Sequence, residues 1–125
     1  MNLLPIAQKL EADGLGVLAE TIYVNTIPVE SPQGILLRGK LQGTKIDHEL
    51  PGYYKTQFQL IVRAATYTVG ETLIKQVIQA LTVNDRQVGS IFVRYMRPVT
   101  KPVVFPLSKG NLLEFAADFD VAFFE

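Results

Sequence analysis

The sequence predicts an α+β fold, with a single antiparallel or mixed β-sheet and two helices packed on one face of it. Three observations support this prediction. Two segments repeat apolar residues at helical spacing, several others alternate polar and apolar residues as strands do, and strands outnumber helices. With 125 residues, of which 48% are hydrophobic, the chain can bury a core of its own. We therefore expect residues 1–125 to form one domain.

The N-terminal part predicts one helix and two short strands. The apolar residues of segment 3–10 recur at spacings of three and four, as on one face of a helix: Leu3, Ile6, Ala7 and Leu10. Pro5 is compatible with a first helical turn. Segment 21–29 is rich in β-branched residues and predicts a strand, which Pro28 places at a strand end or a sheet edge. A turn then leads to a second strand at residues 35–38.

The middle of the chain contains the clearest strand, at residues 54–64. Even-numbered positions from Tyr54 to Ala64 alternate there with mostly polar odd-numbered ones, so we expect one face in the core and the other in solvent. Residues 39–52 precede it and combine glycine and proline with apolar side chains. These features predict an ordered loop whose apolar side chains must dock on some surface.

A second helix is expected to open at residues 69–72 and to continue to Leu81. Its apolar stripe faces the core, and Glu71 and Lys75 have the favourable i, i+4 spacing for an ion pair. Asn84 and Asp85 end the helix, and a long strand follows at residues 88–96.

Two strands are expected at the C-terminal end. Prolines at positions 98, 102 and 106 bracket an apolar run at residues 103–105, which predicts a short edge strand or an extended arm. Residues 113–123 alternate strongly, with phenylalanines on one face and carboxylates on the other. The last segment therefore predicts a strand with one buried face.

Charge is balanced overall, with twelve basic and twelve acidic residues, but it is unevenly distributed. Residues 86–109 carry five basic side chains and no acidic one, and residues 110–125 carry four acidic side chains and no basic one. Two readings remain open. The segments form cross-strand pairs, or they form opposite surfaces that join identical copies head to tail.

Residues 94–97 mix two arginines with a tyrosine, a combination that also occurs on surfaces that bind single-stranded nucleic acid. The neutral chain argues against tight phosphate binding, so a salt-bridged strand end is the favoured interpretation.

Residues that could perform chemistry are few. The one histidine, His48, lies between Asp47 and Glu49, but neighbours in an extended segment point to opposite sides and do not converge as acid–base catalysis requires. The chain has no cysteine, and one histidine leaves a metal site short of ligands. No glycine-rich phosphate loop or serine nucleophile motif is present. The sequence therefore predicts no enzyme, no metal, no cofactor and no membrane span.

Four runs in the middle of the chain resemble the phage minor capsid and tail-completion proteins known as tail terminators: VESPQGILLR (29–38), LQGTKID (41–47), ELPGYYK (49–55) and FQLIVRA (58–64). The resemblance implies a structural protein of the virion neck, assembled in the cytoplasm of a bacterial host. It also implies a six-membered ring of identical copies that caps the tail-tube protein and meets the head-closure or connector protein. DNA passing through the ring lumen would require only non-specific charge.

Candidate contacts with these partners lie on the apolar loop, at the basic strand end and on the proline-bracketed segment: Leu41, Ile46, Leu50, Tyr53, Arg94, Arg97, Val103 and Phe105. Two alternatives stay open. The chain is another neck or tail component, such as a head-closure or tube protein, or it is a small ligand-binding or enzymatic α+β domain. A cavity shared by His48 and two carboxylates would favour the latter.

Overall fold

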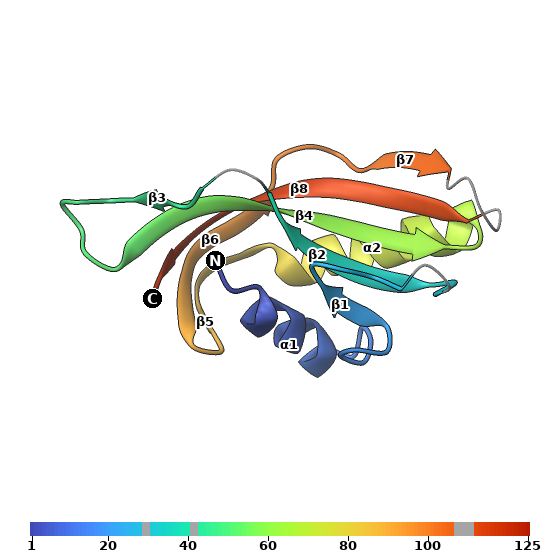
Figure 1. Ribbon diagram of the computed structural model, residues 1–125, viewed down its shortest axis with the longest axis horizontal. Coiled ribbons are helices and arrows are strands. Elements are labelled where there is room, and N and C mark those ends of the chain that lie inside the picture. The colour runs from blue at the N-terminus through green and yellow to red at the C-terminus, as the bar shows by residue number, and fades with distance from the viewer. Residues whose placement is uncertain (29–30, 41–42, 107–111) are drawn as a thin grey trace.

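A computed structural model describes residues 1–28, 31–40, 43–106 and 112–125 of the chain (Figure 1). It confirms the predicted α+β class. The elements follow in the order α1 (Leu4–Ala12), β1 (Ile22–Val24), β2 (Gly34–Gly39), β3 (Lys45–Ile46), β4 (Tyr53–Ala64), α2 (Tyr67–Leu81), β5 (Val83–Val88), β6 (Ile91–Pro98), β7 (Val103–Pro106) and β8 (Leu113–Phe124).

The sheet is built around β4 and β8, which pair antiparallel along their full length. The strand order is β1-β2-β4-β8-β6-β5, and the parallel β1–β2 pair makes the sheet mixed. β2 and β3 lie end to end along the outer edge of β4, and β6 and β7 do the same along the outer edge of β8. The two long strands therefore form the centre of the sheet, called here the β4–β8 spine. Two shorter strands lie one after the other along each of its outer edges.

Both helices cover the same face of this sheet, as the sequence predicts (Figure 1). The core between the helices and the sheet is dominated by aromatic and aliphatic side chains that are almost completely buried, among them Phe58, Leu60, Phe115, Phe119, Phe123, Ile6, Leu10, Ile74 and Leu81. Helix α2 begins two residues before the predicted segment because Thr66 caps it, its hydroxyl accepting a hydrogen bond from the Val69 amide at 3.3 Å. Glu71 and Lys75 form the expected ion pair at 2.7 Å.

Three expectations about the strands are wrong in detail. The strand expected at residues 88–96 is a hairpin, β5 and β6, with Gly89 at the turn and a positive φ of 58°. Residues 84–87 are polar because β5 is an exposed edge strand, so they lack the alternation of a half-buried one. β1 is shorter than segment 21–29, and the loop at 39–52 contains strand β3.

The face of β4 that the sequence predicts to be exposed to solvent is buried at one end. Ile61 and Arg63 are only 5% and 7% exposed there. The Arg63 guanidinium donates through Nε and Nη2 to Glu114 Oε2, each at 3.2 Å, and through Nη1 to the carbonyl oxygens of Pro28 at 2.8 Å and Ser31 at 3.1 Å. Pro28 and Ser31, which lie between β1 and β2, therefore supply acceptors at this ion pair, which is why an arginine is tolerated at a buried position.

Gly70 fixes how closely α2 approaches the sheet. A methyl group at residue 70 would lie 2.0 Å from Cε1 of Phe115, whose ring is itself buried. Gly70→Ala is therefore expected to lower the free energy of unfolding by about 2 kcal/mol, because the clash outweighs the better helix propensity of alanine. Gly39→Ala, with no atom within 4 Å of the added methyl, is the matched control and should leave stability unchanged in chemical denaturation. A stabilised Gly70→Ala variant would contradict this packing.

Candidate interaction surfaces

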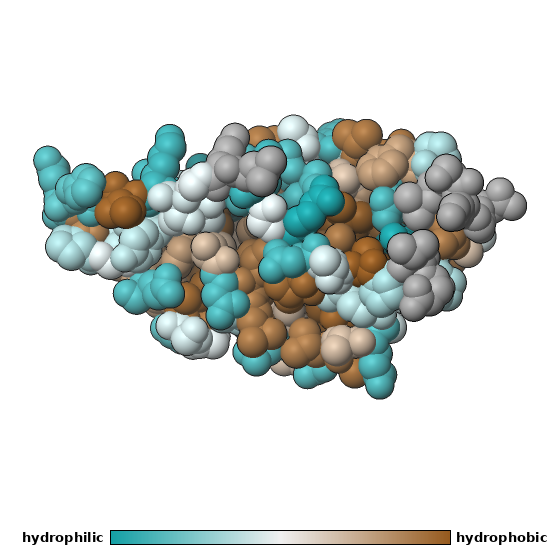
Figure 2. Space-filling model, viewed as in Figure 1, coloured by the Kyte–Doolittle hydropathy of each residue, from teal (hydrophilic) through white to brown (hydrophobic). Residues whose placement is uncertain are grey.

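The β3–β4 arm, defined here as residues 45–53, projects from one end of the sheet (Figure 1). Its apolar side chains are not docked on their own domain, since Ile46 is 62% and Leu50 45% exposed. Figure 2 shows the resulting hydrophobic patch at the left end of the molecule, surrounded by polar atoms. Tyr53, at the base of the arm, is half-buried, and its ring centroid lies 4.8 Å from that of Phe124. The fourth candidate of this loop, Leu41, lies outside the described residues.

The turn of the arm is held by local hydrogen bonds. Asp47 Oδ1 accepts from the Glu49 amide at 3.0 Å, and the Asp47 carbonyl accepts from the Leu50 amide at 3.3 Å. Gly52 follows with a φ of 84°, a conformation that favours glycine. The apolar side chains are thus presented on a defined turn.

Strand β7 forms a second exposed apolar surface. Val103 is 62%, Val104 37% and Phe105 38% exposed. Among the described residues β7 pairs only with β8, so its other edge is open, as predicted for a short edge strand. Brown surface over β7 appears at the upper right of Figure 2. An open edge with apolar side chains is a common place for another chain to bind.

A groove of about 370 Å³ lies between α2 and β7, and the sequence did not predict it. Phe115 and Ile74 lie at its base, Ile78 and Val104 contribute apolar side chains, and Lys101 also borders it. The segments that form it are far apart in the sequence, so no local pattern reveals it. The available signals were the apolar run at 103–105 and Tyr67, the first residue of α2, which is 54% exposed.

Charged groups at the groove are coupled on the α2 side. Hydrogen bonding to the Glu71 carboxylate raises the pKa of both Tyr67 and Lys75. The hydrogen bond from Lys75 in turn lowers the pKa of Glu71. Glu71 and Lys75 are therefore oppositely charged at neutral pH and compensate each other. Lys101 forms no salt bridge with any described residue, so the groove has a net positive charge.

The two candidate arginines lie on β6. Arg94 forms an ion pair with Asp85 on the neighbouring β5, and Arg97 stacks over the Tyr95 ring, 4.2 Å from its centroid. Arg97 also lies opposite Asp120 of β8 in the strand register. The basic and acidic segments are thus side by side in one sheet at this point, which favours cross-strand pairing over two separate surfaces.

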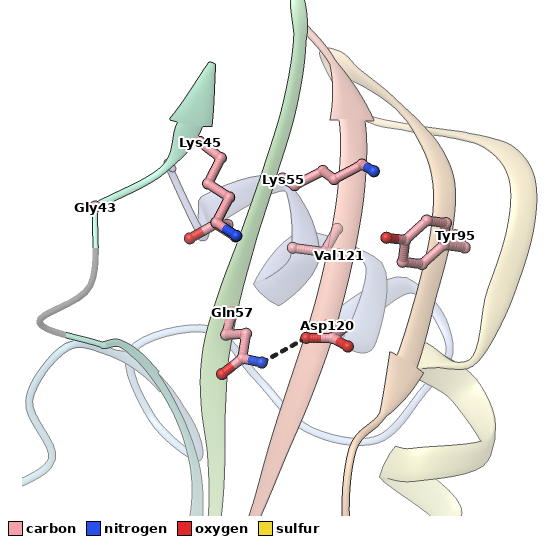
Figure 3. A pocket seen from close by; sticks show the side chains of 8 residues that line it. Gly43, Lys45, Lys55, Gln57, Tyr95, Asp120 and Val121 are labelled. Atoms are coloured by element: carbon pink, nitrogen blue, oxygen red, sulfur yellow. Dashed lines mark hydrogen bonds between the residues drawn. The ribbon is translucent and has the colours of Figure 1, made fainter. Parts of the chain in front are cut away.

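The helix-free face carries a small polar cleft of about 200 Å³ (Figure 3). Lys45 and Lys55 lie at one end of it, and Gln57 Nε2 donates to Asp120 Oδ1 at 2.6 Å at the other. Tyr95 borders it from β6. The cleft combines two amines with a carboxylate that is already hydrogen-bonded, an arrangement suited to polar surface contacts.

His48, Asp47 and Glu49 do line one shallow depression, of about 380 Å³, because all three are consecutive on the exposed arm. No hydrogen bond joins His48 to either carboxylate within the described part of the chain, and Asp47 is used by the turn. The groups are open to solvent, whereas proton transfer requires them in contact with an enclosed substrate. This depression therefore does not favour the enzymatic alternative.

Two further results concern metals and membranes. Across residues 1–28, 31–40, 43–106 and 112–125, no cluster of three or more histidine, aspartate or glutamate side chains is arranged to hold a metal ion. No helix found in these ranges has both the length and the apolar character that crossing a bilayer requires.

Comparisons with known proteins point in one direction. A family model described as bacteriophage tail terminator protein matches residues 9–123. A chain in a solved structure titled "Virion of native gene transfer agent (GTA) particle" superposes with a TM-score of 0.68 and 15% sequence identity. The match covers 96% of this chain and 92% of that one, so the two share a fold. No curated protein sequence matches significantly.

Proposed function

This chain belongs to the bacteriophage tail terminator family, whose members are structural proteins that cap the tail in the virion, and we propose that identical copies of it form a ring. Identical copies close on the last ring of the tail-tube protein and stop its growth. The opposite face of the ring receives the head-closure or connector protein. The family match over residues 9–123 is the observation that carries this proposal.

The described surfaces are suited to such a role. A capping ring needs contacts between copies and contacts with the tube and the head, and exposed apolar side chains in patches are typical of protein interfaces. The chain presents such patches at the β3–β4 arm and at β7. Arg94 and Arg97 remain candidate contacts, as do non-specific contacts between charged side chains of the lumen and passing DNA. The ring size of six also remains a prediction.

The test is growth of tail tubes from the tube protein of the same phage, followed by electron microscopy of tube length. Wild-type protein is expected to give short tubes that each end in a ring. Tubes of unchanged length, with no ring at their ends, would overturn the proposed function. Long stacked tubes of the protein alone would instead identify it as a tube subunit.

The arm is expected to be required for capping but not for folding. Ile46→Ser with Leu50→Ser should leave the melting temperature within a few degrees of wild type, because both side chains are exposed, while capping of tubes is lost. Phage carrying the double variant should yield unjoined heads and tails of poorly controlled length. Val17→Ser, at a residue that is 48% exposed and outside the arm, is the matched control and should cap normally.

Early melting of the Ile46→Ser, Leu50→Ser variant would show that the arm belongs to the core. Normal infectious particles from this variant would remove the arm from the function altogether.

A further inference from the structure

The β3–β4 arm has the properties of an inserting segment. Ile46 and Leu50 are exposed on a turn whose backbone is already fixed by hydrogen bonds to Asp47. A segment that is ordered before binding loses little conformational entropy when it docks. The carbonyl of Gly52 accepts a hydrogen bond from the Glu125 amide at 3.0 Å, which ties the base of the arm to the end of β8. The arm is therefore an apolar projection of defined shape.

The groove between α2 and β7 has the properties of a receiving site. Its volume of about 370 Å³ suits one or two aliphatic side chains of a partner. The Phe115 ring at its base is held by the close approach of α2 at Gly70 and lies 5.7 Å, centroid to centroid, from the Tyr67 ring. Neither the helix nor the ring has to move to open the groove. It is a preformed site for an apolar side chain.

The charges of arm and groove are complementary. The arm carries Asp47 and Glu49 close to Leu50, and with Lys45 at its start its net charge is −1. The groove is bordered by Lys101, which has no salt-bridge partner among the described residues, and by the mutually compensating Glu71 and Lys75. An acidic turn that enters this groove would place its carboxylates near Lys101. Such complementarity orients the two surfaces and disfavours other partners.

The two surfaces lie at opposite ends of the long axis (Figure 1). Tyr53 at the base of the arm and Val62, which pairs with Phe115, are about nine residues apart on β4, and this corresponds to roughly 30 Å of extended strand. The arm cannot reach the groove of its own chain. We propose that the arm of each copy docks into the α2–β7 groove of the next copy, head to tail, with Leu50 as the inserted side chain.

This contact would join the ring of the proposed function, and it rests on that proposal. It uses two different surfaces of the same chain, so each added copy leaves one arm and one groove unused until the ring closes. The arm would then contact a second copy of the chain, and the tail tube would contact the ring elsewhere.

Cross-linking of purified protein tests the contact without any tube protein. The chain has no cysteine, so Leu50→Cys and Val104→Cys each introduce a single thiol. Mixing these two variants with a short bismaleimide should give covalent dimers containing one copy of each. A protein carrying both substitutions should give a ladder of larger products. Val17→Cys replaces Val104→Cys in the matched control and should give several-fold less dimer.

Charge exchange supplies the second readout. Lys101→Glu added to the Val104→Cys protein should lower the yield of dimer, and Glu49→Lys added to the Leu50→Cys protein should restore it. An equal yield with Val17→Cys would overturn the proposal. The proposal would also be overturned if the Leu50→Cys protein, in the presence of tube protein, cross-linked to the tube protein instead of to a second copy of the chain.

The outcomes for this contact and for the proposed function are separable. A cross-link that forms in a protein unable to stop tube growth would overturn the capping function and leave the arm–groove contact standing. Normal capping by a protein that gives no cross-link would overturn the arm–groove contact and leave the capping function standing.

Discussion

Phe119→Ala is expected to lower the free energy of unfolding by about 3 to 5 kcal/mol, and the melting temperature by more than about 10 °C. Phe119 is completely buried and its ring stacks on that of Phe58, with centroids 5.3 Å apart and planes inclined by 14°. Both rings lie in the centre of the β4–β8 spine, so the cavity would be lined from all sides and could not collapse. Phe58→Ala should have a similar effect for the same reason.

Thermal and chemical denaturation check this expectation. His48→Ala is the control, because His48 is exposed on the arm and should be close to neutral. Phe119→Leu, which keeps most of the volume, should lose clearly less than Phe119→Ala. The assignment of the core face of β8 would be contradicted if His48→Ala melted earlier than Phe119→Ala.

Glu114→Ala is expected to lower the free energy of unfolding by about 2 kcal/mol, because it removes the carboxylate that accepts two hydrogen bonds from the buried Arg63 guanidinium. The carbonyl oxygens of Pro28 and Ser31 would still accept hydrogen bonds from Arg63 Nη1. The double variant Arg63→Met with Glu114→Leu should recover part of the loss, because it removes both buried charges together, while the carbonyl oxygens of Pro28 and Ser31 lose their donor.

The exposed ion pair between Arg94 and Asp85 provides the matched comparison. Both of its side chains are more than half exposed, so Asp85→Ala should change stability by less than about 1 kcal/mol. Urea denaturation of the single and double variants measures all three effects. Equal losses for Glu114→Ala and Asp85→Ala would show that the Arg63 end of the sheet is open to water.

The sequence predicts those elements whose burial is regular along the chain. β4 and β8 alternate, and α2 repeats its apolar residues at helical spacing, because each buries one face against the same core. Periodicity does not predict β5, because this strand is an exposed edge and its residues 84–87 are polar on both faces. Arg63 likewise looks like a solvent-facing residue in the sequence, but it is buried beside Glu114, Pro28 and Ser31. Both errors arise where tertiary neighbours decide burial.

The candidate surfaces divide in the same way. Apolar side chains between glycines and prolines indicate the arm and β7 directly, and Ile46, Leu50, Val103 and Phe105 are indeed exposed. The groove requires α2 to lie beside β7, and nothing in either segment alone specifies that neighbourhood. Family resemblance in the middle of the chain indicates the role in the virion, whereas the contact proposed between copies is argued only from the three-dimensional arrangement.

The pairing of β4 with β8 also has a consequence for how the protein is made. Residues 53–64 have no long partner until residues 113–124 have been synthesised, so the spine is built from contacts of long sequence separation. Such contacts make folding slow, because a long loop must close before they form. A nascent chain that ends before β8 leaves the long edge of β4 unpaired, and an unpaired strand edge is prone to pair with other chains. Each copy therefore completes its sheet only after residues 113–124 have been synthesised, so the surfaces proposed to join copies are presented late.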